Sequence, residues 1–529
     1  MTGRLGKMMK EQINPITRLD YPDPDVIRVK DTYYMVTTTM HFMPGCEILR
    51  SYDLVHWEHA SYVYDRLDST LGQRLEGSAH IYGKGMWAAS LRYHRGVFYI
   101  CFVANDTGKT YLYRAQDIHG PWSRQYVEGF YHDASLLFDE EKVYIAFGNK
   151  EIRILELNED LSGPKKGGFN RIVVRDEGNT ILGYEGSHFY KINGRYYLFF
   201  IHSLKERWRR VEACFAADTL EGEFRGGDIL NDDRGYCDSG AAQGGIVDTP
   251  EGKWYAILFQ DYGASGRIPV LVPVDWKEGY PVFGKAGKIP ETFEVPEGRQ
   301  GYIYRSLTDS DDFRRREKFT DTAEDRRTLS ETYDTYGFKS CWQINHEPVL
   351  SLIHNDCERG LLEITTGKLC ESIVQAQNIF TQRMRFPECS GSVTVDGSGL
   401  LEGDYAGISV FAGCYGFVAL TKREGKYYVV MRERGLEEES GEIEWVCIPA
   451  EGSTVQFMVS ADFNGMKDEA CFYYKSGSEF VRIGPEKKLY FRRDHFSGCR
   501  IGLFVYASGA IGGTARFSDF VYGYGAENG

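Results

Sequence analysis

The segment KDTYYMVTT (30–38) carries the pattern that decides the fold: a polar turn, then a strand with two bulky residues, Tyr33 and Tyr34, near its start. The pattern recurs in HRGVFYICF (94–102), EEKVYIAFG (140–148), NGRYYLFFI (193–201) and EGKWYAILF (251–259), at intervals of 65, 45, 53 and 58 residues. A short apolar strand precedes each turn, which indicates a β-hairpin. Five strand-only units of this length predict a five-bladed β-propeller; an ordinary β-sandwich with unrelated hairpins is the alternative.

One position in the repeat should face the propeller's central channel, because the first strand of each blade lies nearest to it. Counting back 10 or 11 residues from each bulky pair gives this slot in every repeat, and its occupants are Asp23, Trp87, Asp133, Glu185 and Gln243. Three carboxylates brought together raise the energy of one another's charged forms, which a purely structural position has no reason to do. The slot is therefore a candidate functional site.

Three clustered acids suit glycoside hydrolysis, which needs one carboxyl group protonated and another ionised. In an inverting enzyme the two lie about 6.5–9.5 Å apart, a gap that residues on different blades could span. A third acid near the proton donor keeps it protonated, and Trp87 offers a flat wall for a sugar ring. The alternatives are a metal-dependent enzyme that binds Ca²⁺ or Mg²⁺ through the three acids, and a site for a cationic ligand. Taken singly, each acid also has a plain explanation in a turn or at a strand end.

Several segments resemble glycoside hydrolase family 43, the β-xylosidase and α-L-arabinofuranosidase family. They are NPITRLDYPDPDVIRVKDTYYMVTTT, GMWAASLRY, HDASLLFD, YEGSHFYKINGRYYLFF and GGIVDTPEGKWYAILFQD, in the family's order between residues 14 and 284. The resemblance implies an inverting mechanism in which Asp23 is the general base, Glu185 the general acid, and Asp133 the residue that orients the acid and tunes its pKa.

The resemblance also implies weaker assignments. Arg267 would bind the sugar hydroxyls, and His41 and Phe42 in HFMPG would lie near the sugar ring, although Met43 stands where relatives often carry an aromatic residue. Many relatives have a histidine at the fifth slot that helps to hold a metal ion or water, whereas this chain has Gln243. No cofactor is required by this chemistry, and a structural Ca²⁺ in the channel is compatible with the amide oxygen.

The composition of the chain argues against some classes of binding partner. A net charge of −14 without basic clusters argues against nucleic acid, and no apolar run is long enough to span a bilayer. The start of the chain has no apolar region typical of a secretory signal, and the twelve cysteines form no C-x-x-C pair or zinc spacing. We therefore expect free thiols, a cytoplasmic location and short, imported substrates.

The second half indicates a different all-β domain. After a Pro- and Gly-rich stretch, strands such as AGISVFAG and KYYVVMRER alternate as in a β-sandwich. WQINHEP, AQNIFTQR and GDYAGISVF resemble the concanavalin-A-like jelly-roll that follows the propeller in many family 43 β-xylosidases. The predicted domains are a propeller over 1–305 and a sandwich over 306–529 that packs on it; sugar binding by the sandwich is the rival role.

Together these features predict an exo-acting, inverting glycoside hydrolase that releases terminal β-D-xylose or α-L-arabinofuranose from xylo- or arabino-oligosaccharides. The alternative is a non-catalytic, lectin-like sugar-binding propeller. The sequence does not separate the two sugars and allows a homo-oligomer without indicating one.

Overall fold

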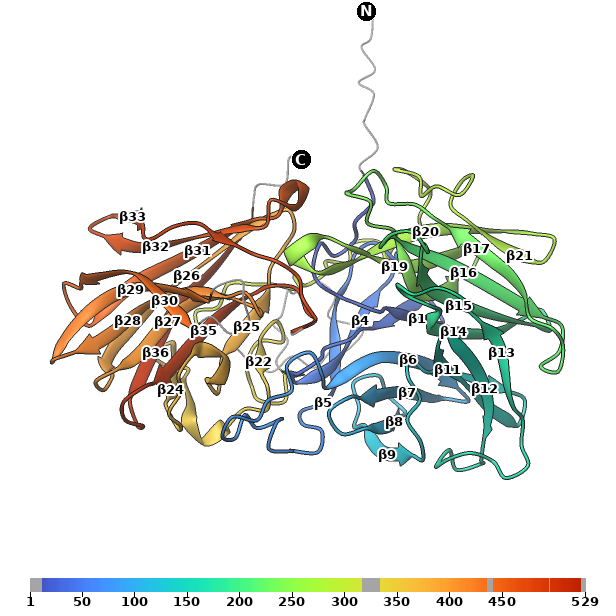
Figure 1. Ribbon diagram of the computed structural model, residues 1–529, viewed down its shortest axis with the longest axis horizontal. Coiled ribbons are helices and arrows are strands. Elements are labelled where there is room, and N and C mark those ends of the chain that lie inside the picture. The colour runs from blue at the N-terminus through green and yellow to red at the C-terminus, as the bar shows by residue number, and fades with distance from the viewer. Residues whose placement is uncertain (1–11, 316–333, 435–440, 494, 525–529) are drawn as a thin grey trace, which may run out of the picture.

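The computed structural model describes residues 12–315, 334–434, 441–493 and 495–524, and these residues are almost entirely β structure (Figure 1). The only helices among them are four single 3₁₀ turns: η1 (Gly263–Ser265), η2 (Leu350–Leu352), η3 (Ile373–Gln375) and η4 (Asn464–Met466). Within the same ranges, no helix is both long and apolar enough to cross a bilayer.

The first half forms five four-stranded antiparallel sheets, each connected in chain order except that β3 lies outside the first. Each bulky pair of the repeat falls on the second strand of a sheet, as the hairpin pattern predicts. The sheets are β1 (Asp25–Val29), β2 (Thr32–Val36), β4 (Gly45–Ser51), β5 (Glu58–Tyr64); β6 (Met86–His94), β7 (Val97–Ala104), β8 (Lys109–Ala115), β9 (Ser123–Val127); β10 (Ser135–Asp139), β11 (Lys142–Asn149), β12 (Glu151–Leu157), β13 (Asn170–Arg175); β14 (Glu185–Ile192), β15 (Arg195–Ser203), β16 (Arg210–Ala217), β17 (Arg225–Leu230); and β18 (Ala242–Asp248), β19 (Trp254–Asp261), β20 (Arg267–Lys277), β21 (Tyr280–Phe283).

The first strands of the five sheets close into a ring. Strand β1 contacts β6 and β18, while β10 contacts β6 and β14, and β14 contacts β18. The N-terminal segment supports this closure, because the side chain of Asn14 exchanges two hydrogen bonds of 2.7 Å with the backbone of Leu271 on β20. The prediction of a five-bladed propeller is confirmed.

A single buried arginine ties four blades together at the ring. Arg92 on β6 forms an ion pair of 2.7 Å with Asp25 on β1 and donates hydrogen bonds of 2.7 Å to Ser135 Oγ and the Leu136 carbonyl on β10. A longer bond of 3.4 Å reaches the carbonyl of Phe189 on β14. Because a buried carboxylate requires a partner, this network fixes the blades that carry the slot residues.

The second half is the predicted β-sandwich, with a core of large buried side chains such as Trp342, Phe457 and Phe517 between its sheets. One sheet has the order β3 (Phe42–Met43), β22 (Gln343–Asn345), β25 (Phe380–Arg383), β35 (Arg500–Ala507), β27 (Asp404–Phe411), β28 (Gly416–Arg423), β29 (Lys426–Arg434), β30 (Glu442–Pro449). The other has the order β23 (Ile353–Asp356), β24 (Leu361–Thr365), β36 (Thr514–Tyr524), β26 (Glu388–Gly399), β31 (Thr454–Asp462), β32 (Glu469–Ser476), β33 (Glu479–Arg482), with β34 (Lys487–Lys488) also paired to β32.

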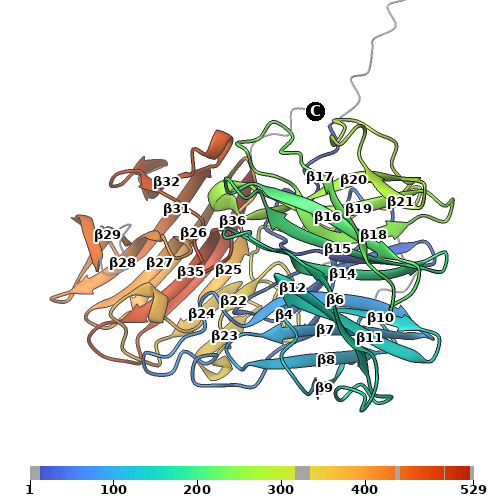
Figure 2. The ribbon, with the colours of Figure 1, turned by 45° about the vertical axis from the view of Figure 1, so that its right-hand side comes forward.

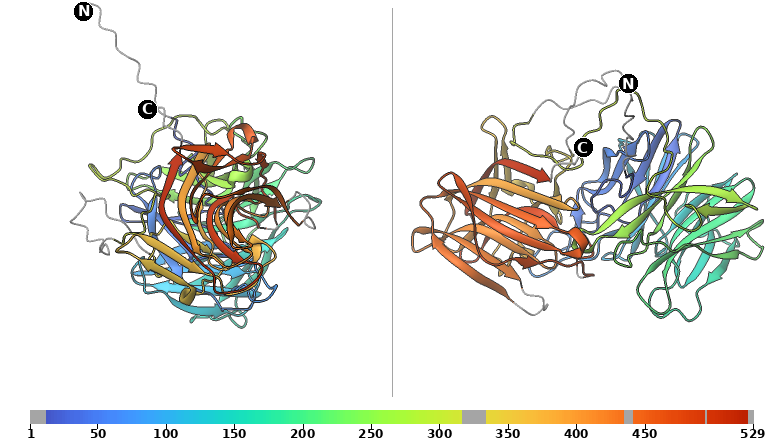
Figure 3. Two further views of the ribbon diagram at one scale, coloured as in Figure 1. Left: turned by 90° about the vertical axis from the view of Figure 1, so that its left-hand side faces the viewer. Right: turned by 90° about the horizontal axis from the view of Figure 1, so that it is seen from above.

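The two halves lie against each other in all views (Figures 2 and 3) and share a sheet. Strand β3 comes from the propeller half of the chain but pairs with β22, so that Met43 faces Ile344 and Phe42 faces Asn345. A buried ion pair of 2.8 Å joins Arg383 to Glu47 across the same interface. Propeller strands end at Phe283 and sandwich strands begin at Gln343; the boundary at 305 and 306 stays a prediction.

Candidate active site

The backbone at the slot turns side chains into the channel. Asp23, Asp133 and Gln243 all have positive φ angles, of 53°, 47° and 56°, a conformation that is uncommon for residues other than glycine. Such backbone conformations persist only where the surrounding structure enforces them, and they are frequent at functional sites. Because the same uncommon conformation recurs at one slot in three blades, we infer that the fold enforces it to direct these side chains into the channel.

Register shifts also direct side chains into the channel, in three of the innermost strands. The ladder slips between Met86 and Ala89 on β6, around Trp87, and between Glu185 and His188 on β14. It also slips next to Gln243, on β18. An extra residue at a strand's start bends the strand and re-aims the side chain beside it.

Gly186 allows two slot residues to approach closely. Its φ is 67°, and a Cβ atom there would lie 2.7 Å from the side-chain Cδ of Gln243. Any larger residue would push Gln243 out of the channel or move Glu185, its neighbour in sequence.

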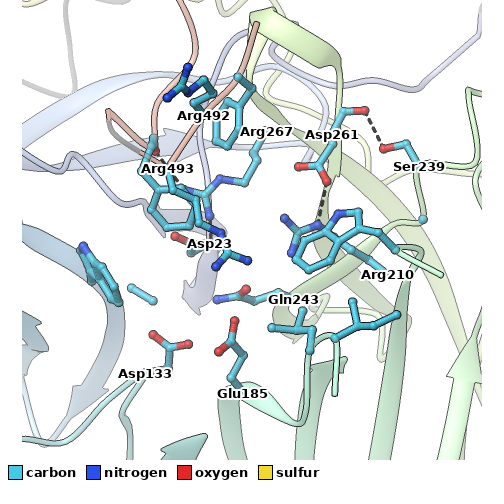
Figure 4. Close-up of a pocket in the computed structure, with 18 of the residues that line it drawn as sticks. Asp23, Asp133, Glu185, Arg210, Ser239, Gln243, Asp261, Arg267, Arg492 and Arg493 are labelled. Atoms are coloured by element: carbon cyan, nitrogen blue, oxygen red, sulfur yellow. Dashed lines mark hydrogen bonds and ion pairs between the residues drawn. The ribbon is translucent and has the colours of Figure 1, made fainter. Parts of the chain in front are cut away.

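The structure brings the predicted slot residues to one cavity of about 1110 Å³ (Figure 4). Asp23 and Asp133 are buried in its floor, while Glu185 is partly exposed to it. Trp87, Gln243 and Arg267 line the same cavity. The acids therefore meet around one channel, although 162 residues of sequence separate the first from the last.

Asp23 is held from two sides. One carboxylate oxygen forms an ion pair of 2.7 Å with Arg267, and the other accepts a hydrogen bond of 2.7 Å from Thr38 Oγ1. Arg267 is itself buried, and its guanidinium carbon lies 4.6 Å from the ring centroid of Phe496 in the sandwich half. In this structure the arginine orients the predicted base, and its contact with the sugar hydroxyls stays a prediction.

Asp133 and Glu185 form a close pair with a histidine between them. His132 Nε2 lies 3.5 Å from a carboxylate oxygen of Asp133 and 3.6 Å from one of Glu185. One nitrogen or oxygen atom from each of the three side chains lies within 4.8 Å of the other two. The backbone N–H of Gly186 donates to Asp133 at 3.0 Å, and Asn149 Nδ2 donates to Glu185.

Electrostatics in this trio follow from burial and proximity. Burial raises the pKa of Asp133 to about 6; the charges of Glu185 and Asp23 add to this effect and His132 opposes it. The charge of Asp133 raises the pKa of His132 to about 9, so its imidazole is positively charged at neutral pH. The Asp133 carboxyl group therefore loses its proton less readily than an isolated one, because burial and the neighbouring carboxylates disfavour its charged form.

Trp87 lies on the cavity wall beside this trio. Its Nε1 donates to the Gly83 carbonyl at 3.3 Å, and its ring is edge-on to His132 with 5.7 Å between centroids. The indole is partly exposed and lines the cavity, and its stacking on a sugar ring stays a prediction.

Two predicted sugar contacts do not reach the cavity. His41 and Phe42 are 0% and 1% exposed and are absent from the residues that line it. Because strand β3 joins the sandwich sheet, the Phe42 ring packs under Arg500 at 3.4 Å and His41 packs against His346, with 5.0 Å between ring centroids. The expectation that they lie beside the sugar is corrected: in this structure they belong to the interface between the two halves.

The geometry does not provide a full ligand set for either predicted metal site, the channel Ca²⁺ or an ion held by the three acids. Ca²⁺ takes roughly six to eight oxygen ligands, whereas Gln243 supplies one amide and its backbone N–H donates to Glu212 at 2.7 Å. Among the described residues, the one group of ligand atoms close enough to share an ion is His132, Asp133 and Glu185, and Asp23 lies outside it. A channel Ca²⁺ therefore stays a prediction, and the three predicted acids do not form one ligand set.

Sequence reasoning missed several cavity residues. His132 directly precedes Asp133 and could have been noticed for that reason alone, whereas Asn149 and Trp208 carry no local signal. A loop of the sandwich brings Phe491, Arg492, Arg493 and Phe496 into the wall, and these residues carry no local signal either. Its approach depends on how the two halves pack.

Comparison with known proteins supports the same assignment. Residues 13–281 match Glycosyl hydrolases family 43, and residues 330–523 match the Beta xylosidase C-terminal Concanavalin A-like domain. A Beta-xylosidase of Formosa agariphila is 25% identical, with 97% of this chain and 90% of that protein covered. A Xylosidase/arabinosidase 43B of Humicola insolens is 24% identical and covered over 97% of both chains.

Solved structures agree over nearly the whole chain. A bifunctional GH43-CE protein of Bacteroides eggerthii is 39% identical with a TM-score of 0.87; the match covers 97% of this chain but only 64% of that longer one. A GH43 glycoside hydrolase engineered to display both endo-xylanase and exo-arabinofuranosidase activity is 25% identical with a TM-score of 0.84, over 96% and 99% of the two chains. The family match over half the chain confirms the resemblance seen in the sequence, and the chain belongs to glycosyl hydrolases family 43.

Proposed function

We propose that this glycoside hydrolase removes single β-D-xylosyl or α-L-arabinofuranosyl units from the non-reducing ends of short oligosaccharides, with inversion at the anomeric carbon. The observation that carries the proposal is the division of the cavity floor. Asp23 is held by Arg267 and Thr38 on one side, and the Asp133–Glu185 pair lies apart from it on the other. The names of the relatives, β-xylosidases and arabinosidases, support the two sugars.

In the proposed reaction Glu185 donates its proton to the leaving glycosidic oxygen while Asp23 takes a proton from the water that attacks the opposite face. Asp133 and His132 keep the donor oriented and set the pH range in which the pair holds a proton. General acid and base catalysis of this kind each contribute about 10²–10⁴-fold to a rate. The names of the relatives, which include a β-xylosidase and a non-reducing end α-L-arabinofuranosidase, support cleavage from a chain end.

A panel of nitrophenyl glycosides tests the reaction, with NMR detection of the first-formed anomer. We expect turnover of the β-D-xylopyranoside, the α-L-arabinofuranoside or both, and an initial product of inverted configuration. A retained configuration would refute the mechanism, and no turnover of either glycoside would refute the substrate class. Full activity after exhaustive chelation would exclude a metal-dependent reaction through His132, Asp133 and Glu185.

The location is a separate proposal. All twelve cysteines are free thiols in this structure, which agrees with a reducing compartment such as the cytoplasm.

A further inference from the structure

The mouth of the cavity combines an exposed indole with arginines from both halves of the molecule. Trp208 precedes β16, lines the cavity and is 44% exposed. The guanidinium carbons of Arg210, from the propeller, and Arg493, from the sandwich, lie 5.1 and 5.8 Å from its ring centroid. Figure 4 shows Arg492 and Arg493 on the opposite side of the cavity from Asp133 and Glu185.

The charge of the mouth is opposite to that of the floor. Cationic side chains from several elements line the cavity, namely Lys84, Lys150, Arg209, Arg210, Arg492 and Arg493, and Arg210, Arg492 and Arg493 lie away from the Asp133–Glu185 pair (Figure 4). Arg210 is paired with Asp261 at 2.7 Å, and Arg209 with Asp238. Among the described residues, Lys84, Lys150 and Arg493 have no carboxylate within 4.0 Å. A chain with a net charge of −14 thus has positive side chains without a close carboxylate in the wall of its candidate active site.

This arrangement sits where the departing part of a substrate must lie. In the proposed exo-acting reaction the terminal sugar occupies the floor, so the rest of the oligosaccharide passes the mouth. An exposed indole binds the apolar face of a sugar ring, and a guanidinium binds a carboxylate through two parallel hydrogen bonds. A neutral xylo-oligosaccharide uses only the first of these.

We propose that the mouth is a subsite for a uronic acid, so that the preferred substrates are acidic oligosaccharides whose carboxylate meets Arg493 while a sugar ring stacks on Trp208. The inference rests on the proposed function for its orientation of the substrate. It extends that function from neutral pentose chains to chains that carry glucuronic acid near the cleaved end.

The test compares three substrates of equal backbone length: neutral xylotriose, xylotriose with glucuronic acid on the second residue, and the methyl ester of that acid. The ester keeps the shape and removes the charge. Because one charge-assisted hydrogen-bonded contact is worth about tenfold in affinity, we expect kcat/KM for the acid to exceed that for the ester by about tenfold at low salt. Raising the salt to 0.5 M should narrow the ratio.

Variants assign the effect to the mouth. Arg493→Gln should bring the acid-to-ester ratio close to one, whereas Arg493→Lys should keep part of it. Lys475→Gln, which removes one positive charge from an exposed position on β32 outside the cavity, should leave the ratio unchanged. Trp208→Ala should lower kcat/KM for acid and ester alike.

A wild-type ratio of one, with xylotriose still cleaved, overturns the inference and leaves the proposed function standing. A high ratio that survives Arg493→Gln also overturns it, because the charge would then be recognised elsewhere. If no substrate is cleaved, the proposed function fails, and calorimetric dissociation constants for the acid and the ester decide the inference by the same ratio.

Discussion

Replacing His41 by phenylalanine should make the protein less sensitive to acid. His41 lies fully buried in the interface between the two halves, and its ring is 5.0 Å from that of His346 and 5.7 Å from that of His495. Burial lowers the pKa of all three well below the ordinary value, for His495 to about 3, and neighbouring positive charges such as Arg500 beside His41 add to the effect. The charges of exposed His80, of Lys368 beside His346 and of Arg434 beside His495 act in the same direction.

The magnitude follows from linkage. In the unfolded chain each histidine takes up a proton below pH 6.5, whereas the folded interface keeps these three neutral until far lower pH. The unfolded state therefore binds more protons, and stability falls as the pH falls below 6.5. From pH 7.5 to 5.5 each buried neutral ring costs about 1.4 kcal/mol of unfolding free energy, and the three together about 4 kcal/mol.

The assay is urea unfolding followed by tryptophan fluorescence at both pH values. His41→Phe keeps an aromatic ring and removes one titrating group, so the loss of stability between pH 7.5 and 5.5 should shrink by about 1.4 kcal/mol. His354→Phe is the matched control, since that exposed side chain is in water in both states and its removal should leave the loss as in the wild type. An identical pH dependence in the wild type and His41→Phe would refute the reasoning.

The remaining predictions concern the active site and the ring of blades. Glu185→Ala should abolish cleavage of xylo-oligosaccharides but spare aryl glycosides with good leaving groups, which need little protonation; equal losses on both would argue against Glu185 as the acid. Asp133→Asn removes a negative charge beside the proposed acid and should move the basic limb of the pH–rate profile to lower pH. His132→Phe removes a positive charge there and should move the same limb to higher pH; unchanged profiles would contradict this tuning. Arg92→Leu should cost about 3–5 kcal/mol of stability by leaving Asp25 buried without its arginine, and adding Asp25→Asn should recover part of the loss in the same denaturation assay.

The propeller and its floor could be predicted because their information is local and repeated. A bulky pair such as Tyr196 and Tyr197 marks the second strand of a blade, and the number of residues between the pair and the channel hardly varies. Once five blades surround one channel, equivalent positions must converge. Asp23, Asp133 and Glu185 are therefore found together without knowledge of any contact between them.

The positions of His41 and Phe42 were predicted wrongly because they depend on a strand pairing that no local sequence pattern indicates. Strand β3 holds only Phe42 and Met43, and its partner on β22 is about 300 residues away in the sequence. Backbone hydrogen bonds join them, and these do not depend on side-chain type. HFMPG therefore gives no sign that it leaves its blade for the sandwich sheet, and the loop around Phe496 was equally hidden.

Residues from both halves of the chain line the cavity, and in the proposed mechanism the two halves have different roles. The propeller supplies the floor, where in the proposed mechanism Asp23 and Glu185 act on the terminal sugar. The sandwich supplies the wall at Arg493 and Phe496, which only the departing part of the substrate passes. His495, buried in the interface, lies between these two wall residues in sequence, so the contact that holds the halves together also holds the loop. Substitutions in the loop should thus alter the choice among leaving groups, whereas those in the floor should reduce turnover of every substrate.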